Sequence, residues 1–149
     1  FHHFDCEGPG LVGLASFSSV HRDWTHLCWD SQSVGLLIGA VMPQAFSGFL
    51  QAPTPAVETM FGQLAALSVF GGIAVAPGVI SVRSLDGFVQ RPHSYDIGFV
   101  AGEPHQLLLA GSPPGFGPWE HLLTQPDFAT LEPKQRNDLL MRIVTTTAN

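Results

Sequence analysis

The stretch that decides the fold runs from Thr59 to Val82 and reads TMFGQLAALSVFGGIAVAPGVISV. It carries no charge and is long enough for a bilayer span, which needs about 20 mostly apolar residues. Two pairs of turn-forming residues, Gly71-Gly72 and Pro77-Gly78, interrupt it. It also lacks the flanking cluster of Lys or Arg that orients membrane helices. We therefore expect a buried helix, a turn and buried strands here, and association with a membrane is the alternative.

The first part of this stretch belongs to the best helix of the sequence, from Pro55 to Phe70. Thr54 suits the N-cap because its hydroxyl can accept a hydrogen bond from a free backbone amide. Pro55 suits the first helical position, and Gly71 suits the stop. Apolar side chains occupy most of the helix circumference, which predicts a helix that is largely buried.

Outward from this helix, the charges are few and unevenly placed. Charged residues make up 12% of the 149 residues and apolar residues 45%, and this charged share is about half the usual one. Glu58 is the only charge between Ser31 and Val82, so we expect the middle third to be buried, embedded in a membrane or covered by a partner. The composition excludes a disordered chain. Twelve acidic residues against six basic ones argue against a nucleic-acid partner.

The remaining segments predict further helices and strands. Ser33–Met42 is apolar without a clear period, so helix and buried strand both remain open there. For the other segments we expect strands at Leu11–Val20 and Val79–Arg83, a hairpin turn at Asp86-Gly87, an antiparallel pair at Ser94–Ala101 and Gln106–Ala110, and helices at Pro43–Gln51, Trp119–Leu123 and Glu132–Thr146.

Helices and strands are segregated along the sequence, which favours an α+β fold. We expect a small antiparallel sheet over about residues 73–110, packed against helices from the charge-poor middle and the C-terminus. We treat residues 1–149 as a single domain, either complete or part of a longer chain.

Cys28 is the candidate nucleophile, because it lies just before a long apolar segment. A thiol at a helix N-terminus is more acidic than usual, and a catalytic cysteine needs a histidine base and an orienting group. We assign His93 as the base, with His105 as its substitute, and Asp96 as the orienting group. The alternative for Cys28, beside Trp29, is a role in core packing.

Two short motifs resemble families of papain-like architecture. Cys28-Trp29-Asp30, with Gln32, resembles the Cys-aromatic-acid-x-Asn stretch of arylamine N-acetyltransferases, and residues 96–99 resemble their Asp-Val-Gly-Phe strand. Asp5-Cys6-Glu7-Gly8 is similar to the Asp-Cys-Ser-Gly motif of NlpC/P60 peptidases. The two resemblances select different cysteines, and neither has the family's histidine at the expected place. What they imply is an architecture in which a helix bearing the cysteine packs against a small antiparallel sheet.

The first thirty residues contain two further patterns. Gly8, Gly10 and Gly13 match G-x-G-x-x-G, with Asp30 where a ribose-binding acid would lie. Because the preceding segment is short and polar and the following one reads as a strand, we expect a plain turn. Zinc could be bound by mixed donors, but their spacing matches no zinc pattern, so we expect buried thiols and surface imidazoles, with no metal and no cofactor. These donors are His2, His3, Asp5, Cys6, His21, His26 and Cys28.

Three function hypotheses follow from these observations. The first is a thiol-dependent hydrolase or acyltransferase that acts on a small-molecule or peptide substrate. The second is a binding or oligomerisation module whose apolar middle third contacts a protein partner or a second subunit. The third is a protein that associates with a membrane.

Overall fold

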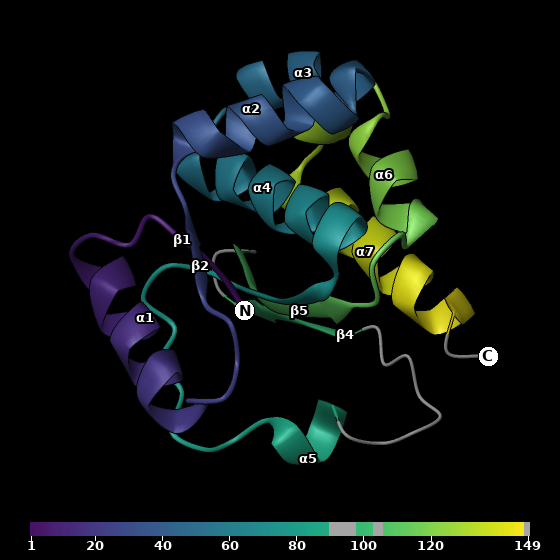
Figure 1. The fold of residues 1–149 in the computed structure, drawn as a ribbon. Coiled ribbons are helices and arrows are strands. Elements are labelled where there is room, and N and C mark those ends of the chain that lie inside the picture. The colour runs from purple at the N-terminus through teal and green to yellow at the C-terminus, as the bar shows by residue number, and fades with distance from the viewer. Residues whose placement is uncertain (90–97, 103–105, 148–149) are drawn as a thin grey trace.

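The computed structural model describes residues 1–89, 98–102 and 106–147. Its strands form one sheet, with helices on both faces (Figure 1). The strands are β1 His2–Phe4, β2 Leu27–Trp29, β3 Gly72–Val75, β4 Gly98–Gly102 and β5 Gln106–Ser112. The α-helices are α1 Pro9–Val20, α2 Ser31–Val41, α3 Pro43–Leu50, α4 Pro55–Phe70, α5 Asp86–Val89, α6 Gly117–Leu123 and α7 Pro133–Thr147, and a short 3-10 helix spans Phe128–Thr130.

The sheet is mixed, with the strand order β2-β1-β3-β5-β4. β1 runs parallel to β2 and β3, whereas β5 is antiparallel to β3 and β4. The α+β class is therefore confirmed, and the antiparallel part falls where the sequence predicted it. The whole sheet is mixed, because the N-terminal segment adds two parallel strands that the sequence did not predict.

The segment Leu11–Val20 is helical, and the prediction of strands there was wrong. It belongs to α1, which begins at Pro9 and buries Gly10, Gly13 and Phe17. These buried positions recur at intervals of three and four residues, the period of a helix face. Two of these buried residues are glycines. The buried face of the helix therefore cannot be recognised from the spacing of hydrophobic residues.

The capping residues of two helices decide their starts. The open choice at Ser33–Met42 is resolved as α2, since Asp30 Oδ1 accepts a hydrogen bond from Ser33 N–H at 2.7 Å. In α4 the predicted cap is confirmed, with Thr54 Oγ1 accepting from Val57 N–H at 3.3 Å. Helices α3, α6 and α7 also agree with their predicted positions.

The segment after β3 forms neither the predicted strand at Val79–Arg83 nor the hairpin at Asp86-Gly87. It runs along α1 instead, and two backbone amides bind side chains of that helix region. Ser81 N–H donates to Ser16 Oγ at 3.0 Å, and Leu85 N–H donates to His21 Nε2 at 2.9 Å. These tertiary hydrogen bonds replace the ladder bonds that a strand would have made.

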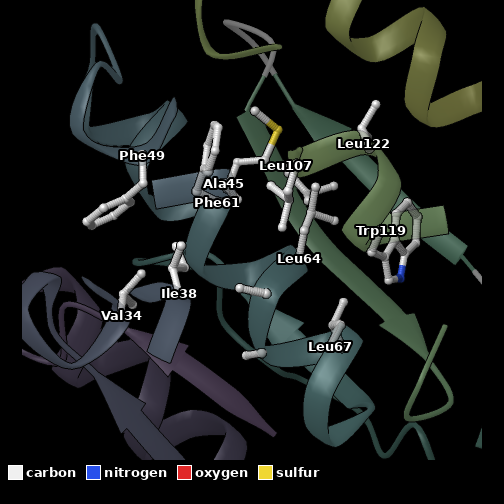
Figure 2. Close-up of a cluster of buried hydrophobic side chains, with 14 of the residues drawn as sticks. Val34, Ile38, Ala45, Phe49, Phe61, Leu64, Leu67, Leu107, Trp119 and Leu122 are labelled. Atoms are coloured by element: carbon white, nitrogen blue, oxygen red, sulfur yellow. The ribbon is translucent and has the colours of Figure 1, made fainter. Parts of the chain in front are cut away.

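The main core lies between α4 and its neighbours (Figure 2). Phe61, Leu64 and Leu67 of α4 are fully buried among side chains of α2, α3, β5 and α6. A smaller cluster on the α1 face of the sheet contains Phe1, Phe17, Ile73 and Val75. In the described parts of the chain, no helix is long and apolar enough to cross a membrane.

Candidate functional site

The described cavity opens where β1 and β2 end. After β1 the chain continues into α1, whose Phe17 packs in the smaller cluster. After β2 it continues into α2, whose Val34 and Ile38 pack in the main core. Two neighbouring parallel strands thus send their connections to opposite faces, and in open α/β sheets ligands bind in the crevice at such a point.

The cavity has a volume of about 60 Å³ and is built by three elements besides the strand ends. The loop after β1, the start of α2 and the first turn of α4 form its walls. Its lining combines apolar side chains with carboxylates and hydroxyls. The lining residues are Phe4, Asp5, Trp29, Asp30, Ser31, Val34, Pro55, Glu58 and Thr59.

The carboxylates of this cavity differ in their surroundings. Asp5 has a φ of 49°, a left-handed conformation that aspartate adopts more readily than most residues. Asp30 caps α2, and the hydrogen bond from Ser33 N–H lowers the pKa of its carboxyl. Glu58 accepts a hydrogen bond from Ser31 Oγ, which joins α4 to α2. Within residues 1–89, 98–102 and 106–147, no group of three or more His, Cys, Asp or Glu side chains is placed to hold a metal ion.

The two cysteines form a disulfide beside this cavity. Cys6, in the loop after β1, is bonded to Cys28 of β2, with their Cα atoms 6.2 Å apart. The expectation of two buried thiols was therefore wrong, and Cys28 holds no thiol that could attack a substrate in this state. The pairing could not be predicted from the sequence, because the two cysteines are 22 positions apart. Only the folding of the β1–α1–β2 unit brings them together.

The other predicted catalytic residues, His93, Asp96 and His105, lie outside the described residues. The structure therefore does not test whether they approach Cys28, and the thiol-dependent hydrolase or acyltransferase stays a prediction. In the β1–β2 ladder the residue opposite Cys28 is His3, which is neither of the two predicted bases.

Most histidines near the N-terminus are buried, which corrects the expectation of surface imidazoles. His2 donates from Nε2 to Gly71 O at 2.9 Å and accepts from Trp29 Nε1–H at Nδ1. His21 accepts from the backbone N–H of Leu85 at Nε2, and its Nδ1 donates to Phe17 O at 3.1 Å. Each ring uses one nitrogen as donor and the other as acceptor, so both imidazoles are neutral.

His3 and His26 form a direct pair, with 3.1 Å between His3 Nε2 and His26 Nδ1. His26 Nε2 also lies 3.0 Å from His21 O and donates to that carbonyl. Burial, followed by the neighbouring His26, lowers the pKa of His3 to about 4. His3 is therefore neutral at pH 7, and the ring of His26 stacks on the rings of Phe1 and His3.

The glycine motif lies between a buried strand and a helix, which the sequence analysis did not expect. Two of its three glycines, Gly10 and Gly13, nevertheless make room for this chain's own backbone. A Cβ at Gly10 would lie 1.7 Å from Asp5 O, and one at Gly13 would lie 2.7 Å from Val79 O. The motif is therefore explained by close packing of α1 against two loops, with no need for a nucleotide.

A second candidate surface is formed by α2 and α3. Four large apolar side chains are exposed there, and no charged residue occurs between Asp30 and Glu58. We call this surface the α2–α3 face. Its exposed apolar residues are Leu36, Val41, Phe46 and Leu50, with exposed fractions of 68%, 48%, 36% and 66%.

Comparison with known proteins finds no relative. No protein-family model, no curated protein and no solved structure matches this chain.

Proposed function

We propose that this protein is a binding module that associates with a second copy of itself through the α2–α3 face. The observation that carries the proposal is the exposure of Leu36, Val41, Phe46 and Leu50 on a surface without charge. Single exposed apolar side chains are normal in folded proteins, but contiguous apolar patches mark interaction sites.

Phe46 of α3 lies beside α2. Phe46 and Leu50 lie one turn apart on α3. The Phe46 ring lies against α2, where its carbon atoms are 4.0 Å and 3.8 Å from the Cβ positions of Gly35 and Gly39. Leu36 lies between these two glycines in the sequence of α2. Burial of these exposed apolar side chains would stabilise a complex by roughly 25 cal/mol per Å².

The charge distribution permits a second copy as the occupant of this face. The chain has a net charge of −6, so two copies repel each other through most approaches. The α2–α3 face contributes nothing to this repulsion, because its helices contain no ionised side chain. A two-fold axis through this face would place the same apolar residues opposite each other, as in an isologous dimer.

Light scattering coupled to size exclusion tests the proposal with matched variants. We expect Leu36→Glu and Leu50→Glu each to shift the protein from dimer to monomer, because each places a carboxylate opposite its own copy. Val82→Glu is the control, since Val82 is exposed to 84% and lies outside the face. A monomeric wild type, or equal effects of all three variants, would contradict the proposed interface.

A further inference from the structure

The Cys6–Cys28 disulfide joins the two strand ends that form the cavity. Cys28 is exposed on the edge strand β2, and Cys6 is half-buried. Their sequence neighbours Asp5 and Trp29 both line the cavity. Asp5 N–H also donates to Trp29 O at 3.0 Å. The disulfide and this one hydrogen bond together hold the loop after β1 against β2.

The two hydrophobic clusters stabilise the fold without the disulfide. The main core between α4 and its neighbours contains neither cysteine, and neither does the smaller cluster on the α1 face. Loss of the disulfide therefore leaves the buried apolar contacts of both faces in place. What it releases is the loop at residues 5–8, which includes the left-handed Asp5.

The surroundings of the disulfide are acidic. Asp5 and Glu7 flank Cys6, and Asp30 follows Cys28 by two residues. All three carboxylates belong to exposed residues, and no Lys or Arg occurs among residues 1–21 or 23–82. An approaching anionic thiol is repelled by this charge, and a cationic one is attracted.

We propose that the Cys6–Cys28 disulfide is a thiol-exchange site that reacts preferentially with neutral or cationic thiols, and that its reduction releases residues 5–8 from β2 without unfolding the protein. An incoming thiolate attacks the more accessible Cys28 Sγ. The Cys28–thiol mixed disulfide forms, and Cys6 leaves as a thiolate that takes up a proton. A second thiol attacks the thiol-derived sulfur of the adduct. Two thiols are thus oxidised to one small disulfide, while Cys6 and Cys28 are both reduced.

Two small thiols of opposite charge test this selectivity on the native protein. Cysteamine carries an ammonium group, and 2-mercaptoethanesulfonate carries a sulfonate group. The rate at which each thiol reduces the Cys6–Cys28 disulfide is divided by the rate at which the same thiol reduces a small neutral disulfide. At low salt we expect the normalised rate of cysteamine to exceed that of the sulfonate at least about five-fold. The ratio should approach one at high salt, because added ions screen exposed charges. Early alkylation and mass spectrometry should find the adduct on Cys28.

Variants and hydrogen exchange complete the test. Glu7→Gln should reduce the ratio of the normalised cysteamine rate to the normalised sulfonate rate. Glu120→Gln, which removes another exposed carboxylate, should leave this ratio unchanged. After reduction, exchange should increase at residues 5–8 and stay slow in α4. Equal normalised rates at low salt, a first adduct on Cys6, or reduction that occurs only with loss of the helical signal would each overturn the proposal.

Discussion

At the scale of single residues, neutral histidines let a polar N-terminal segment form a central strand. His2 and His3 are 4% and 3% exposed, and β1 lies between β2 and β3. Their ring nitrogens bind Gly71 O, Trp29 Nε1 and His26 Nδ1, which offsets the cost of burying polar groups. The arrangement depends on the rings remaining uncharged.

Acid is therefore expected to destabilise the fold. The pKa of His3 is lowered from 6.5 to about 4 in the folded state, so the unfolded chain binds a proton at higher pH than the folded chain. The contribution of neutral His3 to the free energy of unfolding is therefore fully present above about pH 6.5, and it is lost as the pH drops from there toward 4. Urea unfolding should show a loss on the order of 2 kcal/mol over this window.

His3→Phe provides the matched variant for this pH effect, because it keeps an aromatic ring and removes the titration. Its unfolding free energy should depend less on pH than that of the wild type. His121→Gln, at an exposed position, should leave the dependence unchanged. A wild-type stability that stays constant from pH 7 to about pH 4 would contradict the neutral network.

Close packing of α1 against the loop after β1 requires glycine at position 10. Gly10→Ala would bring a methyl group within 1.7 Å of the Asp5 carbonyl oxygen, so the loop and α1 must separate. We expect a loss of about 3 kcal/mol in unfolding free energy, measured by denaturant titration. Gly87→Ala is the control, because a Cβ there meets no atom within 4 Å, and an equal loss in both variants would contradict the explanation by packing.

At the scale of elements, the sequence predicted α3, α4, α6 and α7 and left α2 open between helix and strand. Thr54 and Gly71 bound α4 as expected, and the antiparallel pair of β4 and β5 was predicted as well. The β1–α1–β2 unit was missed because its strands have three residues each and its buried helix positions include glycines. The cavity was missed for the same reason, since it depends on this unit.

The disulfide provides the element-scale prediction, because it closes the β1–α1–β2 unit across a separation of 22 residues. A chain of that length gains roughly 3 kcal/mol from the bridge by the loop-entropy argument. The double variant Cys6→Ser, Cys28→Ser should lose about that amount in urea unfolding and keep its far-UV circular dichroism. A variant that is unfolded in buffer, or one as stable as the wild type, would disagree with this description.

At the scale of the whole molecule, the charge-poor middle third has two roles. Most of its α4 residues are buried, whereas α2 and α3 expose apolar side chains. The sequence predicted that this region would be buried, embedded in a membrane or covered by a partner, but it could not separate these outcomes. That separation needs the packing of α2 and α3 over α4, which the apolar pattern of Ser33–Met42 leaves undefined.

Salt is expected to strengthen self-association. Two copies with a net charge of −6 each repel one another, and added salt screens this repulsion while the apolar contact persists. The dimer dissociation constant should therefore decrease as sodium chloride is raised, measured by fluorescence anisotropy of labelled protein. A constant that increases with salt would point to ion pairs across the contact and would contradict a charge-free interface.

Sedimentation velocity of the unmodified protein tests the central claim most directly. Over a concentration range from about 1 μM to 1 mM, we predict a shift of the sedimentation coefficient from that of a 16.0 kDa monomer to that of a dimer. In parallel runs, Leu50→Glu should remain a monomer throughout the range. A wild type that sediments as a monomer at every concentration would contradict self-association through the α2–α3 face.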